Sequence, residues 1–265
     1  MSDSLKISRN GRVACIALDR PALHNAFDDR LIAELHAALD LVGNDVDVRA
    51  VVLTGNGASF SAGADMQWMR RMAQASEADN QADSERLAAL MHRLNFLPKP
   101  TVARINGAAF GGGVGLVACC DIAIASDMAK FALSEVKLGL VPAVISPYVV
   151  AAIGLRAARR LFLTGETIDA AEAVRIGLVH QVVAAADLDA TVERTLELLA
   201  KGGPHAQREA KALALAMGGM RAEAASNVDR ENAALIARLR VSAEGQEGLG
   251  AFLDKRAAGW HSSSG

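Results

Sequence analysis

The chain has 265 residues, of which 51% are hydrophobic and 22% charged, and it carries a formal net charge of −2. This length and balance are typical of one large globular domain, or of a domain with a helical appendage, and they exclude an intrinsically disordered chain. The weak net charge gives no electrostatic basis for binding nucleic acid, so we expect no nucleic-acid partner.

The cysteines and the N-terminus indicate the compartment. Cys15, Cys119 and Cys120 show no metal-ligand spacing, and the last two lie within an apolar run. The N-terminal segment MSDSLKISRNGR is polar, and no apolar run reaches membrane-spanning length. We therefore expect buried thiols, no metal site, no membrane contact and a reducing, cytoplasmic location.

Strand patterns and helical patterns alternate along most of the chain. Residues 28–42 place Leu31, Leu35, Leu39 and Val42 on one helix face. Runs rich in β-branched and apolar residues begin near Val13, Val48, Pro100 and Asp121. Strands that alternate with helices predict parallel pairing and a layered α/β core.

Two further segments bear on the domain organisation. Residues 74–83 are polar, which is typical of a mobile surface segment. Beyond about Ala184 the pattern is almost wholly helical, with Ala- and Leu-rich runs. We predict a core at residues 1–190 and a helical C-terminal module at residues 191–265.

A triple glycine in residues 106–121, NGAAFGGGVGLVACCD, leads directly into an apolar helix. Gly111, Gly112 and Gly113 lack a Cβ, so a ligand can approach the backbone closely. The first N–H groups of the helix have no intrahelical partner and can bind an anion. The Lys-Ser or Lys-Thr of a P-loop and the dinucleotide-binding spacing are both missing, which favours a developing oxyanion. A glycine turn that only allows close packing is the alternative.

A second turn of small residues lies at residues 55–66, GNGASFSAGADM. It follows the strand-like run VRAVVLTG and again leads into a helix-like stretch. Each turn could supply one backbone N–H to the same oxygen, and an oxyanion hole needs about two such donors.

Six segments of the chain together resemble the enoyl-CoA hydratase/isomerase, or crotonase, superfamily. They are RPALHNAF (20–27), FSAGADM (60–66), PTVARINGAAFGGGVGLVACCDIAIAS (100–126), FALSEVKLGLVP (131–142), LTGETIDAAEAVRIGLVHQVV (163–183) and EGLGAFLDKR (247–256). The resemblance covers nearly the whole chain and implies a spiral of β-β-α units followed by a helical trimerisation module. It implies an acyl-CoA substrate, trimers that often pair into hexamers, and no separate cofactor, because coenzyme A is part of the substrate.

The resemblance assigns the oxyanion-hole donors to the N–H groups of Ala64 and Gly112, and a catalytic carboxylate to Glu135. These donors would hold the charge that develops on the thioester oxygen. Family hydratases commonly use another glutamate three residues after Gly112, where this chain has Gly115. Glu135 could therefore hydrate alone or act as a single-base isomerase between C2 and C4. A weak or inactive member, or a non-catalytic RNA-binding relative, is the remaining alternative.

Gly115 also bears on the substrate, because loss of a carboxylate removes bulk and charge. Such a site would admit a branched or carboxylated acyl chain. The stretch LSEVKLGLVPAVISPYVV resembles bacterial methylglutaconyl-CoA or related branched-enoyl-CoA hydratases of leucine and isoprenoid breakdown. After Pro142 it departs from the glycine-rich loop that is more common in the family.

The remaining expected contacts with the acyl-CoA come from both halves of the chain. Asp65 also fits a helix N-terminal carboxylate that organises its turn. Met66, Met69 and Met72 share a helix face and either pack in the core or line the acyl pocket. Lys255 either meets phosphate or is solvated. The full set of expected substrate-binding residues is Asn25, Ala26, Ala62, Asp65, Met66, Gly111, Gly115, Val141, Pro142, Phe252 and Lys255.

Overall fold

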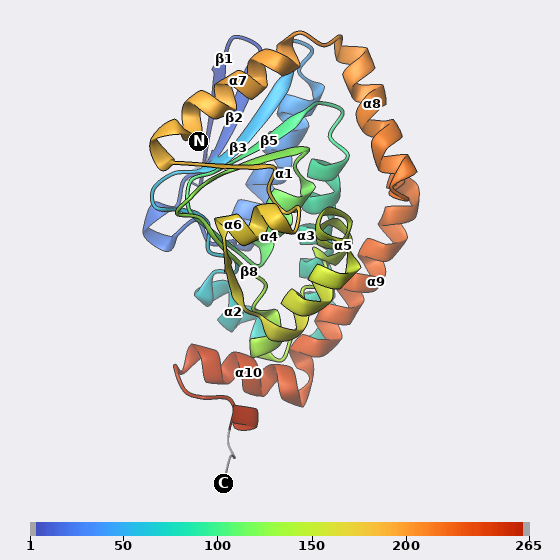
Figure 1. The fold of residues 1–265 in the computed structure, drawn as a ribbon. Helices are drawn as coiled ribbons and strands as arrows, with labels where there is room; N and C mark the ends of the chain where they lie inside the picture. The colour runs from blue at the N-terminus through green and yellow to red at the C-terminus, as the bar shows by residue number, and fades with distance from the viewer. Residues whose placement is uncertain (1–3, 262–265) are drawn as a thin grey trace.

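The computed structural model describes residues 4–261 and contains two β-sheets surrounded by helices (Figure 1). Residues 1–3 of the polar N-terminus and residues 262–265 lie outside the described part. The larger sheet has the strand order β1 (Leu5–Asn10), β2 (Val13–Leu18), β3 (Ala50–Gly55), β5 (Thr101–Ile105), β7 (Ile122–Ser126) and β10 (Gln181–Val183). The smaller sheet has the order β4 (Ser59–Ser61), β6 (Ala108–Phe110), β8 (Lys130–Ala132) and β9 (Thr167–Asp169).

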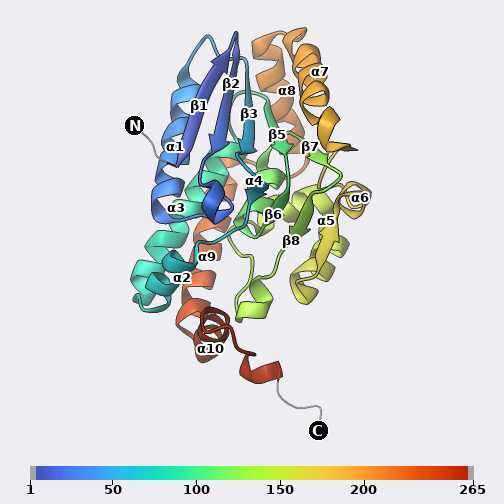
Figure 2. The same ribbon diagram turned by 90° about the vertical axis from the view of Figure 1, so that its left-hand side faces the viewer.

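The larger sheet is covered on both faces. Its strands pair in parallel from β2 to β10, and β1 pairs with β2 in antiparallel fashion. Val51 and Leu53 of β3 belong to the main core, whereas Val52 belongs to a smaller core on the other face. Figure 2 shows α1 (Asp29–Asn44) on one side of the strands and α7 (Leu188–Ala200) on the other. Burial on both faces accounts for the nearly continuous apolar runs of these strands.

Each successive unit of the chain places one strand in each sheet. β3 is followed by β4, β5 by β6 and β7 by β8. The helices that follow these strand pairs are α2 (Met66–Ala73), α3 (Glu77–Asn95), α4 (Gly112–Cys119), the 3₁₀ helix η2 (Glu135–Leu138) and α5 (Ser146–Thr164). β4, β6 and β8 pair in parallel, so their carboxyl ends lie at one edge of the smaller sheet. This is the expected β-β-α spiral, and it brings residues 62–64, 111–112 and 133–135 together.

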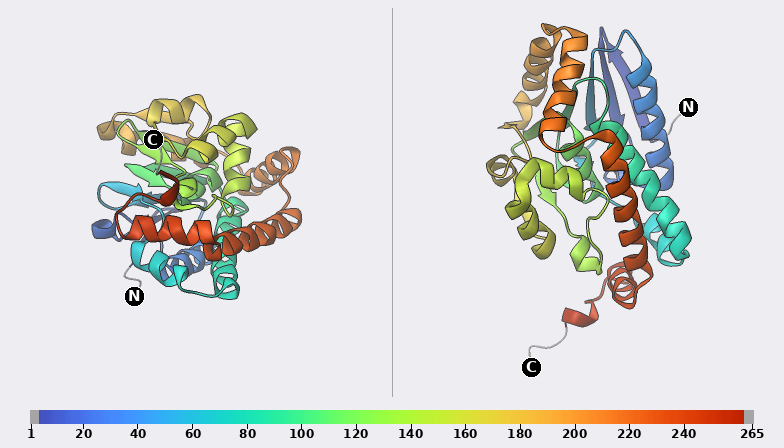
Figure 3. Two further views of the ribbon diagram at one scale, coloured as in Figure 1. Left: turned by 90° about the horizontal axis from the view of Figure 1, so that it is seen from below. Right: turned by 90° about the vertical axis from the view of Figure 1, so that its right-hand side faces the viewer.

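The chain is helical after β10 throughout its described part. These helices are η3 (Ala185–Asp187), α7, α8 (Pro204–Met217), α9 (Ala222–Val241), α10 (Ala243–Leu253) and η4 (Gly259–His261); η1 (Pro21–Leu23) and α6 (Ala170–Arg175) lie earlier. Figure 3 shows α9 lying along α3. The predicted domain boundary at residue 190 falls within α7, whose Leu188 and Val192 pack on the sheet. None of the helices in residues 4–261 is long and apolar enough to cross a membrane.

The longer predicted elements are confirmed. The runs predicted near Val13, Val48, Pro100 and Asp121 form β2, β3, β5 and β7, and α1 buries Leu31, Leu35, Leu39 and Val42. Cys119 and Cys120 are buried, as expected. The strands of the smaller sheet were not predicted, because each has three residues. Three residues are too few for a period-2 pattern.

The expected mobile surface segment at residues 74–83 is wrong over its second half, where α3 begins. Asn80 and Asp83 are 0% and 1% exposed. Asp83 accepts hydrogen bonds from the indole N–H of Trp68 and from Arg240, so its burial is compensated by partners that are distant in sequence. A buried polar residue with distant partners has the same local pattern as a solvated one.

Candidate active site

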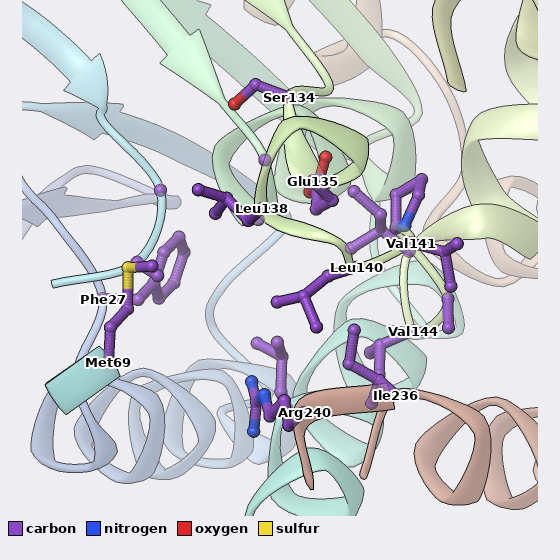
Figure 4. A pocket seen from close by; sticks show the side chains of 18 of the residues that line it. Phe27, Met69, Ser134, Glu135, Leu138, Leu140, Val141, Val144, Ile236 and Arg240 are labelled. Atoms are coloured by element: carbon purple, nitrogen blue, oxygen red, sulfur yellow. The ribbon is translucent and has the colours of Figure 1, made fainter. Parts of the chain in front are cut away.

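A cavity of about 410 Å³ lies at the carboxyl ends of β4, β6 and β8 (Figure 4). Most of the side chains that line it are apolar. The expected site residues that line it are Ala62, Ala64, Gly111, Gly112, Glu135, Val141, Pro142 and Phe252. The expected residues outside its lining are Asn25, Ala26, Asp65, Met66, Gly115 and Lys255.

Ala64 has a backbone N–H that no described residue accepts. Phe27 forms an isolated parallel bridge with Ala64. The N–H of Phe27 donates to Gly63 O at 2.6 Å, and Phe27 O accepts from Asp65 N at 2.7 Å. Because the bridge uses groups of the residues on either side of Ala64, the N–H of Ala64 itself points away from Phe27. Ala64 lines the cavity, so this donor is available to a ligand there.

Gly112 supplies a second free donor at the start of α4. The N–H of Gly111 donates to Ala132 O at 2.9 Å, whereas Gly112 is the first helical residue and its N–H has no acceptor in the described chain. A Cβ on Gly112 would lie 3.3 Å from the ring of Phe27, so this ring packs directly against the glycine. Phe27 thus contacts both turns, and the pair of N–H groups has the composition of an oxyanion hole.

Asp65 and Arg20 fix the turn that carries Ala64. Asp65 caps α2 as predicted, because its carboxylate accepts from Gln67 N at 2.8 Å and Trp68 N at 3.1 Å. The guanidinium of Arg20 lies 3.3 Å from Asp65 Oδ2 and donates to Ala26 O at 2.7 Å. The sequence analysis assigned Arg20 no role. The only feature that could have indicated one is that Arg20 is a cation in the mostly uncharged segment RPALHNAF.

Asn25 shapes the loop below the cavity. The residue is fully buried with φ of 57°, a left-handed conformation that asparagine tolerates. Its amide donates to Asn56 O at 2.9 Å and Ser59 O at 2.8 Å, and its Oδ1 accepts from Arg20 N at 2.9 Å. Both polar groups of this buried side chain therefore bind the protein itself, and they position the chain that leads to Phe27.

The carboxylate of Glu135 lies against the glycine turn. Figure 4 shows the side chain at the border of the cavity. A Cβ on Gly111 would lie 3.1 Å from Glu135 Oε1, so only a glycine leaves full room for this carboxylate. Oε2 is buried and has no hydrogen-bond partner among the described residues. Burial raises the pKa of Glu135 to about 7, against a smaller lowering by a backbone hydrogen bond. At neutral pH such a group can both accept and return a proton.

α10 packs closely on the element that carries Glu135. A Cβ on Gly248 of α10 would lie 2.3 Å from the carbonyl of Leu138, and Gly139 ends η2 with φ of 66°. Phe252 of α10 lines the cavity while 46% exposed, which places it at the rim. Backbone contact of this closeness allows α10 to hold η2 in place.

The three methionines on one face of α2 differ in whether they line the cavity. Met69 and Met72 line the cavity together with Trp68, which is the pocket interpretation of this face. Met66 is 40% exposed and lies outside the lining. Across residues 4–261, no group of three or more His, Cys, Asp or Glu residues is arranged to hold a metal ion.

Comparison with known proteins places the chain in a family. The sequence profile of the enoyl-CoA hydratase/isomerase family matches residues 8–263. The chain belongs to the enoyl-CoA hydratase/isomerase family. It is therefore an enzyme of that family, which disfavours the non-catalytic alternative.

Solved and named relatives agree with this assignment. The crystal structure of an enoyl-CoA hydratase from Shewanella pealeana is similar with a TM-score of 0.80 and 44% identity, over 98% of this chain and 96% of that one. The crystal structure of an enoyl-CoA hydratase from Mycobacterium avium is similar with a TM-score of 0.86 and 34% identity, over 98% of this chain and 100% of that one. The 2,3-dehydroadipyl-CoA hydratase of Escherichia coli is 32% identical, over 95% of this chain and 96% of its own length.

Gly115 departs from the pattern of the family hydratases, and the structure shows what fills its surroundings. A Cβ on Gly115 would lie 2.3 Å from Cγ2 of Ile145 and 3.2 Å from Cε of Met91. Ile145 lines the cavity, whereas Gly115 does not. The hypothesis that Gly115 leaves open room for a branched acyl group is therefore wrong, because Ile145 already occupies that room.

Arg240 of α9 lines the cavity and was missed by the sequence analysis. Its side chain is 14% exposed and contacts Asp83, which lies on the segment predicted to be a mobile surface. The available signal was one arginine four residues after Ile236 on a helix, a pattern that usually belongs to a solvated face.

We predict that Gly115→Ala destabilises the protein by about 1–2 kcal/mol, because the overpacking cost exceeds the roughly 1 kcal/mol gained in helix propensity. The matched control is Gly250→Ala in α10, where the nearest atom to a Cβ is 3.7 Å away, and this change should be neutral or stabilising. Urea unfolding at equal protomer concentration measures both. A Gly115→Ala variant as stable as the control would show that Ile145 does not obstruct the position.

Proposed function

We propose that this enzyme adds water to enoyl-CoA thioesters with Glu135 as its single acid–base group. The observation that carries the proposal is the position of Glu135, whose buried Oε2 has no partner within residues 4–261 and whose carboxylate lies beside the glycine turn. Two backbone donors that no described residue accepts, on Ala64 and Gly112, border the same cavity. No other carboxylate lines the cavity in the described part of the chain.

The steps follow from these groups. The Glu135 carboxylate accepts a proton from a water molecule while the water oxygen bonds to C3 of the enoyl group. The displaced electron pair moves to the thioester oxygen, where the N–H groups of Ala64 and Gly112 stabilise it. Protonated Glu135 then donates its proton to C2, and the carbonyl re-forms. A pKa of about 7 suits both proton transfers, because neither state of the carboxyl is strongly favoured at neutral pH.

The acyl group that we propose is branched or carboxylated, as the methylglutaconyl-CoA resemblance implies. The mostly apolar cavity supports an acyl chain beyond the thioester. The Escherichia coli relative is named for an acyl group with a second carboxylate, which supports the carboxylated class. The absence of a negative charge at Gly115 remains part of this proposal. Open room at Gly115 does not, because Ile145 fills it.

A single-base isomerase is the second candidate, because one carboxylate lines the cavity. Glu135 would then remove a proton from C2 of a 3-enoyl thioester and return it at C4. Mass spectrometry of the products separates the two reactions, since hydration adds one water and isomerisation leaves the mass unchanged.

For coenzyme A we propose that the adenine lies near the backbone of Ala62 and that residues 24–26 line the path of the pantetheine and phosphates. Phe252 and Lys255 would close over coenzyme A from the C-terminal helix. Ala62 and Phe252 border the cavity, which supports this placement. Coenzyme A enters as part of the substrate, so we propose no further cofactor. We also propose a cytoplasmic location, which buried thiols at Cys119 and Cys120 suit.

We propose that the chain assembles into trimers or hexamers. The support is α8, which buries none of its residues within one chain and exposes Leu213 and Met217 by 61% and 72%. Light scattering on the purified protein should give three or six times the 27.7 kDa of one chain. A mass of one chain at micromolar concentration would contradict the proposal.

We predict that Glu135→Gln lowers the hydration rate by about 10²–10⁴-fold and leaves the affinity for a saturated acyl-CoA nearly unchanged. The change removes the proton carrier and keeps the side-chain volume. In the parent enzyme, kcat/KM should rise with pH through about 7, because the ionised carboxylate is the base. Retention of most of the activity by the glutamine variant would remove Glu135 from the mechanism.

A folding measurement on the same variant tests the cause of the raised pKa. Burial favours the protonated carboxyl of Glu135 in the folded state. The stability that comes from keeping this carboxyl protonated is complete at low pH and is lost as the pH rises through about 7. Glu135→Gln should therefore be more stable than the parent at pH 8, by up to about 3 kcal/mol, with a smaller difference at pH 5. Equal differences at both pH values would show that Glu135 is not desolvated.

A further inference from the structure

Two charged side chains lie on opposite sides of the cavity (Figure 4). Within residues 4–261, the ionisable groups that line it are Glu135, Lys137 and Arg240. Lys137 is exposed, whereas the side chain of Arg240 is 14% exposed. Figure 4 shows Glu135 and Arg240 on opposite sides of the cavity, with Leu140 between them. An acyl chain whose thioester lies beside Glu135 therefore extends toward a buried guanidinium.

The guanidinium of Arg240 is only partly used by the protein. Nη1 donates to Asn80 Oδ1 at 3.2 Å and Asp83 Oδ2 at 3.3 Å, and it lies 3.5 Å from Ser84 Oγ. Nη2 and Nε have no hydrogen-bond partner in the described part of the chain. Neither atom is completely buried, so both remain accessible to a ligand. A guanidinium has five N–H donors in a planar fork, so donors remain for a ligand on the cavity side.

Asp83 does not neutralise this end of the cavity. Its Oδ1 already accepts from Trp68 Nε1 at 3.2 Å and from Arg86 at 3.1 Å, so one carboxylate serves two arginines. Asp83 is 1% exposed and does not line the cavity. Arg240 also lies over the ring of Trp68, with Cζ 5.6 Å from the ring centroid. The group of Arg240, Arg86 and Asp83 thus carries one excess positive charge.

We propose that Arg240 binds a carboxylate at the far end of the acyl chain, so that the preferred substrates are enoyl-CoA thioesters of dicarboxylic acids. This inference rests on the proposed hydratase function. A planar carboxylate fits the free donors of a guanidinium, and such charge-assisted contacts are strong in a mostly apolar cavity. A neutral chain of the same length would bury Arg240 without compensating its charge. Arginine keeps its charge in proteins, so the lowering of its pKa by burial does not remove the site.

The test compares two thioesters with acyl chains of equal length, 2-hexenedioyl-CoA and 2-hexenoyl-CoA, on the parent and three variants. Arg240→Gln should lower kcat/KM for the diacid on the order of 10²-fold. The same change should raise kcat/KM for the neutral chain or leave it unchanged, because a neutral chain then no longer covers an unpaired charge. Arg86→Gln is the matched control, because it removes the other arginine on Asp83 outside the cavity and should preserve the preference. Lys137→Gln tests the exposed cation at the rim and should preserve it too.

An inhibition assay on the parent enzyme tests the site without any variant. Adipyl-CoA should inhibit at a concentration at least about tenfold lower than hexanoyl-CoA, because only the diacid can pair with Arg240. Equal inhibition by the two thioesters would overturn the inference, as would a preference that Lys137→Gln removes and Arg240→Gln does not. Hydration of 2-hexenoyl-CoA as fast as the diacid would overturn the inference and leave the hydratase function intact. If the enzyme turned over neither thioester, the hydratase function would be contradicted. The inhibition assay would then still test whether Arg240 binds the carboxylate.

Discussion

The contact of Phe27 with two turns is the constraint on which the site depends. Its backbone bridge decides which way the N–H of Ala64 points, and its ring packs on Gly112, so one residue places both donors. Neither donor is a side chain, and therefore the arrangement can be lost through any change that moves the loop. Arg20 and Asn25 hold that loop with buried and partly buried hydrogen bonds, which explains why residues that do not line the cavity matter to it.

The polar groups of the cavity follow from the same spiral. The carboxyl ends of three short parallel strands bring the turns of Ala64 and Gly112 to Glu135, and α10 holds η2 from the opposite side. The Glu135 carboxylate, whose Oε2 has no partner in the described chain, and the partly used guanidinium of Arg240 are both costly to bury. Each lies where a substrate group could pair with it. Glu135, the acid–base group, and Arg240, the group proposed to bind the distal end of the acyl chain, thus lie at opposite sides of a mostly apolar cavity.

The central strands of the large sheet could be predicted from the sequence, because β2, β3, β5, β7 and α1 are long enough to show their periods. The strands of the smaller sheet could not, since each has three residues, although the glycines at their ends indicated the turns. The burial of Asp83 depends on Trp68 and Arg240, which are far from it in the sequence. The filling of the space at Gly115 by Ile145 is equally non-local, so the residue types alone indicated an opening that the fold closes.

The most direct test of the oxyanion hole is a crystal structure with a saturated, unreactive acyl-CoA bound. We expect the thioester oxygen to lie within about 3 Å of both Ala64 N and Gly112 N, with Glu135 beside the carbons next to the carbonyl. A thioester oxygen that contacts neither N–H, in a complex whose acyl chain occupies the same cavity, would contradict it.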